Sequence, residues 1–295
     1  MKTPAFAILL AIILTCALVS CGGGGGGGGS APATTDSSST NTTTTTSTST
    51  SSTSTSTTTT TYYGTKAPTE AKAVGDIVFS DGSATSYSSG LSLTDAQKSA
   101  AIAMIFYKGT ECSNDGSTRT LGVGLKRSAS TMQWCRWSSD SDCANGYDTN
   151  ITTIRVTSHG STGAYTFSGY KDGSNNLSQI ATVLAGSNDT ETAGNYPAFE
   201  YAKNYGSTNG CIGSYASGWY LPSIAELFQI WKERANINAV VVLCGLTNTF
   251  SSTEFWSSSM GSSQRDFASR LDFDNGGCAD ISKRYNRDVC AVRAF

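Results

Sequence analysis

The first 66 residues of the chain contain no pattern that could build a folded core, and they confine the fold to the C-terminal three quarters of the chain. Residues 22–29 are eight consecutive glycines, and residues 30–61 are almost entirely serine and threonine. Such a segment buries too little apolar surface to offset the conformational entropy that ordering costs. The remaining part, residues 67–295, is long enough for one large domain with a sizeable hydrophobic core.

An export signal precedes this polar segment. Lys2 is followed by an almost wholly apolar run over residues 5–19, which is typical of a signal peptide and too short to span a bilayer comfortably. The run ends in LVSC, residues 18–21, an arrangement that resembles a bacterial lipobox. We predict a signal peptide over residues 1–20 and a mature chain that begins with lipidated Cys21. An ordinary signal peptide with a chance cysteine is the alternative.

Residues 21–66 are predicted to form a disordered tether behind this anchor. A flexible coil of about 45 residues spans roughly 35 to 40 Å, so the domain would stand clear of the membrane. The residue directly after Cys21 is glycine and not aspartate. In a Gram-negative bacterium, this favours sorting of a lipoprotein to the outer membrane. We expect an exported protein that is lipid-anchored at the outer membrane and exposed at the cell surface.

The charge balance and the motifs exclude several classes of function. The chain has 20 basic and 22 acidic side chains, with a net charge of -2, so it offers no basic field for nucleic acid. It contains no HExxH, Walker or CxxC motif. The single histidine, His159, could serve a Ser/His/Asp arrangement, but a lone histidine in a loop is more often exposed to solvent. We therefore expect no catalysis, no cofactor, no metal and no nucleic-acid partner.

Short elements are predicted within residues 67–295. Two capping boxes, Thr94 with Gln97 and Ser223 with Glu226, predict helix starts, and an amphipathic helix is predicted over residues 194–205. Apolar or alternating segments predict strands at 77–79, 101–107, 120–125, 254–257, 270–273 and 289–295. Helices and strands do not alternate regularly. The predicted class is therefore α+β, with short strands, two main helices and much irregular structure.

Seven cysteines follow Cys21, and their number suggests disulfides in an exported domain. They are Cys112, Cys135, Cys143, Cys211, Cys244, Cys278 and Cys290. We expect up to three disulfides and one unpaired thiol, with the connectivity open. A structural zinc site is the weaker alternative, because the cysteines show none of the usual close ligand pairs.

The segment 257–288 has an unusual composition. Polar side chains interrupt an apolar frame there in an order that neither packing nor helix formation requires. Arg, Tyr, Ser and Asn are typical contact residues of recognition surfaces, so the segment is a candidate binding surface. An ordinary polar loop is the alternative interpretation.

Four segments together resemble a known family. They are the LVSC lipobox, GWYLPSIAELFQIWKER at 218–234, EFWSSS at 254–259 and VCAVRAF at 289–295. They resemble the variable lipoproteins of treponemal diversity-generating retroelements and, more broadly, C-type lectin-like domains of the formylglycine-generating-enzyme type. The resemblance is strongest over residues 218–295. It implies a surface lipoprotein whose domain, 67–295, binds a protein or other macromolecular ligand that differs between variants.

In that family, a reverse transcriptase copies a template with errors at adenines and rewrites the 3′ end of the gene. Asparagine codons of the AAC type can thereby become codons for a limited set of other amino acids. Met260, Gln264 and Lys283 do not fit an AAC origin and would be fixed. Cys278 does fit, which would explain an odd thiol. The resemblance implies variable, ligand-binding positions at Gly261, Ser262, Ser263, Arg265, Asp266, Ser269, Arg270, Asp272, Asp274, Cys278, Ala279, Asp280, Ile281, Ser282, Arg284, Tyr285, Arg287 and Asp288.

A lectin-type fold would bury the apolar frame of this region and present the intervening side chains on one exposed, rigid face. The frame consists of Trp256, Phe267, Leu271, Phe273, Val289 and Val292. Sugar binding is not implied by the fold. Two alternatives stay open: a structural or adhesive surface lipoprotein of fixed specificity, and an enzyme of the formylglycine-generating type. The enzyme would need reactive cysteines in a cleft, and none of the seven can be assigned to one.

Overall fold

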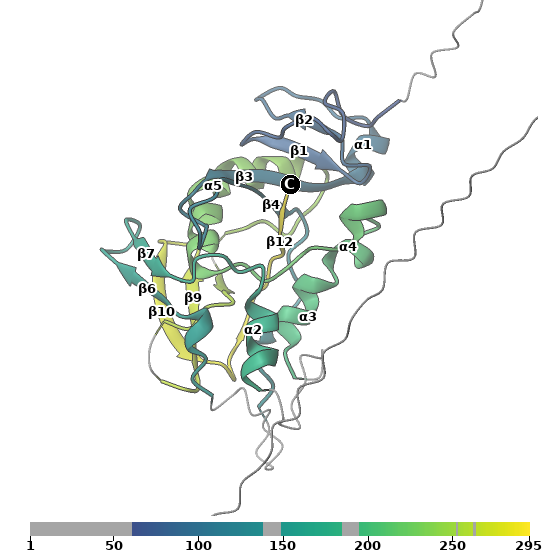
Figure 1. The fold of residues 1–295 in the computed structure, drawn as a ribbon. Coiled ribbons are helices and arrows are strands. Elements are labelled where there is room, and N and C mark those ends of the chain that lie inside the picture. Colours follow the sequence, from purple (N-terminus) through teal and green to yellow (C-terminus); the bar gives the residue numbers. More distant parts are fainter. Residues whose placement is uncertain (1–60, 138–148, 185–194, 252, 262–263) are drawn as a thin grey trace, which may run out of the picture. The chain divides into compact units, whose positions relative to one another are not determined.

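The computed structural model describes residues 61–137, 149–184, 195–251, 253–261 and 264–295. Its ribbon is shown in Figure 1. Contacts divide the chain into two units, Met1–Thr57 and Thr58–Phe295, and every described residue belongs to the second. Cys21, Cys143, Ser262 and Ser263 lie outside the described residues, so the lipid anchor and two of the candidate variable positions stay predictions.

The main sheet has five strands in the order β12-β4-β3-β1-β2, and all neighbours are antiparallel. The predicted C-terminal strand is confirmed as part of this sheet, where it lies at one edge. The strands are β1 (Asp76–Phe79), β2 (Ala84–Ser86), β3 (Ala101–Gly109), β4 (Arg119–Gly124) and β12 (Val292–Ala294).

The continuous apolar run of β3 reflects burial on both faces of this sheet. Met104 and Phe106 point into the core cluster that contains α5 (Ile224–Leu243), which packs along β3. Ile102 and Ile105 belong to a second cluster on the other face, with side chains from α2 and α3. A central strand that is covered on both sides gains from apolar side chains at every position.

The two predicted capping boxes are both confirmed. Thr94 and Gln97 cap α1 (Asp95–Ala100), and Ser223 and Glu226 cap α5. The structure extends α5 beyond the pattern that predicted it, through 20 residues to Leu243. Gly245, two residues after the end of α5, has a φ of +74°. Glycine readily adopts this left-handed conformation at the end of a helix.

The remaining helices are short. The helix predicted over 194–205 is α3 (Pro197–Lys203), which is followed directly by α4 (Tyr205–Thr208), so α5 is the one long helix of the described residues. The sequence patterns did not predict α2 (Asn176–Val183). Two 3-10 helices complete this group, Thr152–Ile154 and Gly213–Ala216. None of the helices in the described part of the chain is long and apolar enough to cross a membrane.

A second, three-stranded sheet contains most of the candidate binding region. Its antiparallel order is β10-β9-β8, and the hairpin of β6 and β7 lies beside it (Figure 1). A further two-stranded sheet pairs β5 with β11. The strands are β5 (Met132–Gln133), β6 (Val156–His159), β7 (Thr166–Gly169), β8 (Glu254–Trp256), β9 (Phe267–Asp272), β10 (Gly277–Ser282) and β11 (Asn286–Arg287).

The expectation of up to three disulfides is wrong, because five of the seven cysteines are free thiols. They are Cys112, Cys211, Cys244, Cys278 and Cys290. Four of these five are buried, and Cys278 is partly buried. These five cysteines serve as small apolar side chains rather than as cross-links.

Candidate functional site

The structure divides the candidate variable positions by exposure. Four are exposed: Arg265, Asp274, Arg284 and Tyr285. Others are partly exposed: Gly261, Asp266, Arg270, Asp272, Cys278, Ala279, Asp280, Ile281 and Arg287. Ser269, Ser282 and Asp288 are buried. The expectation of one exposed face for all of them is therefore not met.

This division results from how the hairpin of β9 and β10 is packed. Cys278 packs against the core cluster that contains α5, and Ile281 packs against the other cluster. Asp288 is buried, and an ion pair with Arg127 at 2.7 Å offsets part of the cost of burying its charge. Both faces of the hairpin thus contact protein, and side chains at its ends and edges are left to face solvent.

The apolar frame is placed largely as expected. The buried members are Trp256, Leu271, Phe273, Val289 and Val292. Phe267 is only partly buried. Of the three positions expected to be fixed, Met260 and Lys283 are fully buried and Gln264 is exposed.

A group of exposed and partly exposed arginine and aromatic side chains combines Trp137, which follows β5, with three residues that follow β10 in sequence. We call it the arginine–aromatic cluster, and it consists of Trp137, Arg284, Tyr285 and Arg287. Trp137 and Tyr285 are 40% and 47% exposed. The guanidinium carbon of Arg284 lies 5.8 Å from the ring centroid of Trp137 and 5.4 Å from that of Tyr285, and that of Arg287 lies 5.8 Å from Tyr285. These residue types dominate binding energy at protein interfaces.

Strand pairing holds the cluster in place. Arg287 in β11 pairs with Met132 in β5, and the Gln133 side-chain amide donates to the Arg284 carbonyl at 2.9 Å. The same Gln133 side chain accepts from the backbone N–H of Trp137 at 3.3 Å. Trp137 was not among the predicted site residues, since it lies far from the C-terminal segment in sequence. The sequence WCRW at 134–137, with two tryptophans and an arginine, was the one local sign of a contact residue there.

Lys283, which precedes the cluster, is buried beneath it. Its ammonium lies 4.8 Å from the ring centroid of Trp134 and donates to the Arg265 carbonyl at 2.8 Å. Trp134 is itself fully buried and donates its indole N–H to the Ser257 carbonyl at 2.8 Å. A buried ammonium that faces an aromatic ring and carbonyl oxygens is a structural feature of the core.

A polar pocket of about 230 Å³ lies between β6 and the hairpin of β9 and β10. Thr157 and Ser158 line one side, and Ser269, Cys278 and Asp280 line the other. The two walls are joined at the turns, where the Gly163 N–H donates to the Gly276 carbonyl at 3.4 Å. The pocket is lined by five of the candidate variable residues, Gly261, Ser269, Cys278, Ala279 and Asp280. It brings them together with strand β6, which the sequence patterns had indicated to be a loop.

His159 lies at the end of β6 and is exposed. Its Nε2 atom is 2.9 Å from the hydroxyl of Ser168 on β7. Among the described residues, no group of three or more His, Cys, Asp or Glu side chains is placed to hold a metal ion. His159 thus belongs to a surface strand pair.

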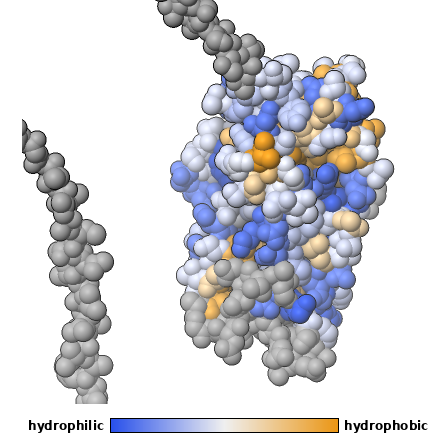
Figure 2. Space-filling model, turned by 90° about the vertical axis from the view of Figure 1, so that its right-hand side faces the viewer, coloured by the Kyte–Doolittle hydropathy of each residue, from blue (hydrophilic) through white to orange (hydrophobic). Residues whose placement is uncertain are grey.

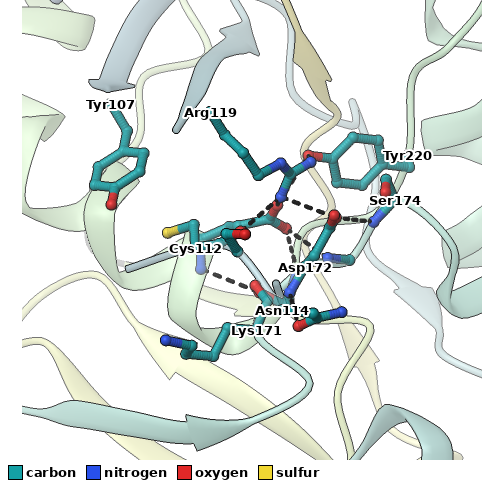
Figure 3. A network of polar contacts seen from close by, with 12 residues as sticks. Tyr107, Cys112, Asn114, Arg119, Lys171, Asp172, Ser174 and Tyr220 are labelled. Carbon is teal, nitrogen blue, oxygen red and sulfur yellow. Dashed lines mark hydrogen bonds and ion pairs between the residues drawn. The ribbon is translucent and has the colours of Figure 1, made fainter. Parts of the chain in front are cut away.

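A buried ionic network joins β4 to the start of α5 (Figure 3). Arg119 lies 2.6 Å from Glu226 and 2.8 Å from Asp172, and it donates to the Tyr220 hydroxyl at 2.9 Å. Glu226 also accepts from the Tyr220 hydroxyl at 2.8 Å and from the Ser223 N–H at 2.8 Å. The sequence pattern identified Glu226 only as a helix cap and gave no sign of its partners.

Burial shifts the acidity of several groups. Desolvation raises the pKa of Glu226 to about 7, with the Arg119 charge opposing the rise. Desolvation also raises the pKa of Cys244 to about 11 and that of Cys278 to about 12. The pKa values of Cys112 and Cys290 are raised for the same reason. These thiols are therefore protonated near neutral pH and are poor nucleophiles.

The stability of the protein is expected to depend on pH through Glu226. Its folded-state pKa of about 7 lies above its ordinary value of 4.5, so the folded state holds the proton more tightly than the unfolded state. This contribution is complete below pH 4.5 and is lost as the pH rises through 7. Relative to Glu226→Gln, the wild-type free energy of unfolding should fall by about 3 kcal/mol between pH 4.5 and 8, measured by urea denaturation. Parallel pH profiles for the two proteins would contradict this assignment.

The face of the molecule shown in Figure 2 carries no large continuous hydrophobic area that would suggest a different binding site. That face carries small hydrophobic areas separated by hydrophilic ones. Exposed large apolar side chains are spread along the described chain, from Tyr62 through Ile212 to Tyr285. Scattered apolar side chains of this kind are normal for a protein surface. We take the arginine–aromatic cluster and the polar pocket as the candidate site, because both contain candidate variable positions.

Comparisons with known proteins bear on the fold. No protein-family model matches the chain, and no curated protein matches it significantly. Its fold is similar to that of a fimbrial protein from Bacteroides ovatus, with a TM-score of 0.51 and 16% sequence identity. The match covers 76% of this chain and 49% of the other, so the chain spans about half the length of that protein. This likeness supports the α+β class, and the lectin-type subdivision stays a prediction.

Proposed function

We propose that the protein is an exported lipoprotein, anchored through Cys21, that binds macromolecular ligands at its C-terminal region and is diversified there by a retroelement. Its domain would be a C-type lectin-like fold of the formylglycine-generating-enzyme type. The arginine–aromatic cluster would supply the main contacts, because Trp, Tyr and Arg side chains combine large contact area with hydrogen bonding. The pairing of β5 with β11 would hold these contacts rigid, which lowers the entropic cost of binding.

The observation that carries the proposal is the alternation of buried and exposed side chains across the segment. Met260 and Lys283, residue types that an AAC codon cannot become by changes at adenines, are fully buried. Arg284 and Tyr285, residue types that it can become, come directly after Lys283 and are exposed. Variation at exposed positions costs little stability, whereas variation in the core costs much. Because Ser269, Ser282 and Asp288 are buried, the proposed ligand contacts exclude them.

The raised thiol pKa values support a role in binding rather than catalysis. An enzyme of the formylglycine-generating type needs a reactive thiolate, and burial disfavours that form at Cys112, Cys244, Cys278 and Cys290. We propose accordingly that the protein is not an enzyme.

A second candidate function is a structural or adhesive surface protein of fixed specificity. The fold likeness to a fimbrial protein favours it. The two candidates share export and surface display, and they differ in whether the C-terminal segment varies within a population.

Deep sequencing of the gene from the Trp256 codon onward, in a cultured population, separates these candidates. Under retroelement diversification, substitutions should concentrate at codons such as those of Arg265, Arg284 and Tyr285 and should trace to adenines in a nearby template. The Lys283 codon should be unchanged and serves as the internal control. A uniform sequence with no template would overturn diversification and leave the fixed-specificity protein.

A further inference from the structure

The polar pocket between β6 and β10 contains a carboxylate whose charge is not balanced by a neighbouring cation. Asp280 lines the pocket and is partly exposed. Its Oδ1 atom accepts a hydrogen bond from the Ser269 hydroxyl at 2.7 Å. A carboxylate offers about four acceptor sites, and among the described residues the Ser269 hydroxyl is the side-chain donor to it.

Neither the structure nor the rest of the sequence supplies an internal cation for this carboxylate. Among the described residues, Asp280 takes part in none of the ion pairs. Arg270, the nearest arginine along β9, pairs with Glu254 at 3.1 Å, and it points to the opposite face of the hairpin from its neighbour Ser269. The internal segments outside the described residues contain no Lys, Arg or His, and the N-terminal 60 residues contain only Lys2.

The other lining groups suit a cation that carries N–H donors. Thr157, Ser158 and Ser269 place hydroxyl-bearing residues around Asp280. The helix end beneath the pocket does not favour an anion instead, because the N–H groups of Ile224 and Glu226 already have acceptors. The Ile224 N–H donates to the Ser259 hydroxyl at 3.0 Å, and Glu226 caps the same turn.

The volume limits what can enter. About 230 Å³ is small for a ligand site, since pockets for drug-sized molecules range from about 300 to 1,000 Å³. It suits the end of one long side chain. With a single carboxylate and neutral hydroxyls, the pocket also lacks the several charged oxygen ligands that a divalent metal prefers.

We propose that this pocket receives the cationic end of an arginine or lysine side chain from a macromolecular partner, with Asp280 as its counter-ion. The inference rests on the proposed binding function and specifies one contact within it. The arginine–aromatic cluster, being rich in positive charge, would contact a different part of the partner. The partner surface would therefore present at least one basic side chain opposite the pocket.

The test uses Nα-acetyl-arginine amide as the probe and its neutral isostere, Nα-acetyl-citrulline amide, as the control. The full-length protein, labelled with nitrogen-15 and held in detergent micelles, is titrated with each while the backbone amide signals of Gly261 and Ala279 are followed. We expect saturable shifts with the arginine probe in the millimolar range and none with citrulline. Nα-acetyl-lysine amide then distinguishes guanidinium from ammonium as the preferred cation.

Three variants locate the interaction. Asp280→Asn keeps the shape and should weaken binding of the probe at least about 10-fold by removing the charged partner. Asp95→Asn makes the same charge change at an exposed position of α1, outside the pocket and the candidate positions, and should leave binding unchanged. Gly261→Ala should also weaken binding, because a Cβ there would lie 2.6 Å from Asp280 Oδ1 and 2.9 Å from the Ser269 hydroxyl.

Equal shifts with citrulline, or unchanged binding by Asp280→Asn, would overturn the pocket proposal. Such a result would leave the proposed function intact if sequencing still reveals variation at Arg284 and Tyr285. Conversely, a uniform gene sequence combined with Asp280-dependent binding would retain the pocket as a contact site of fixed specificity.

Discussion

Replacing Glu226 with alanine is expected to destabilise the folded protein by about 3–5 kcal/mol, the cost of removing one partner from a buried ion pair. Glu226 is fully buried and lies 2.6 Å from Arg119. Its removal leaves the N–H of Ser223 and the hydroxyl of Tyr220 without their acceptor. Urea denaturation, monitored by tryptophan fluorescence, measures the loss.

Glu233→Ala is the matched control for this variant. Glu233 belongs to the same helix but is partly exposed, and its carboxylate accepts from the Asn236 side chain at 3.0 Å. We expect a change within about 0.5 kcal/mol, as for other surface positions. If Glu226→Ala also cost less than about 1 kcal/mol, the network in Figure 3 would contribute little to stability.

The neighbours Lys283 and Arg284 are expected to differ strongly in their effect on stability. Lys283→Ala should cost about 2–4 kcal/mol, because it empties space beneath Trp134 and removes a donor from the Arg265 carbonyl. Arg284→Ala should change the free energy of unfolding by no more than about 0.5 kcal/mol, since its side chain is exposed. The measurement is again urea denaturation of both variants.

This contrast tests the basis of the proposed function. A diversified site requires that variable positions tolerate substitution while the residues between them hold the backbone. If Arg284→Ala proved as costly as Lys283→Ala, Arg284 would belong to the core and not to a ligand-binding surface. In that case the arginine–aromatic cluster would lose its proposed role.

Local signals in the sequence predicted much of the fold. The capping boxes at Thr94 and Ser223 gave helix starts, because side-chain hydrogen bonds to the first turn depend only on residues three apart. The run 101–107 gave β3, since a strand buried on both faces has a distinctive composition. In contrast, α2 begins at an Asn175 whose side chain makes no capping hydrogen bond, so this helix has a weak start signal.

The candidate site was less predictable, because burial there depends on contacts between distant segments. Arg119 and Glu226 are 107 residues apart in sequence, and Trp134 and Lys283 are also distant in sequence, at about 150 residues apart. Composition alone treated Ser269, Ser282 and Asp288 like their exposed neighbours, although packing buries all three. The number of cysteines likewise suggested up to three disulfides, but nothing in their spacing indicated that Cys112, Cys211, Cys244, Cys278 and Cys290 would be free thiols.

The edge position of β12 in the main sheet has a consequence for how such a gene can change. Val292–Ala294 completes the five-stranded sheet beside β4, yet it is encoded downstream of the whole candidate variable segment. A frameshift or premature stop anywhere in that segment would delete this strand and leave the backbone N–H and C=O groups along that edge of β4 unpaired. Such a product should fail to fold. Under the proposed diversification, the last strand would therefore act as a check that rewriting has preserved the reading frame.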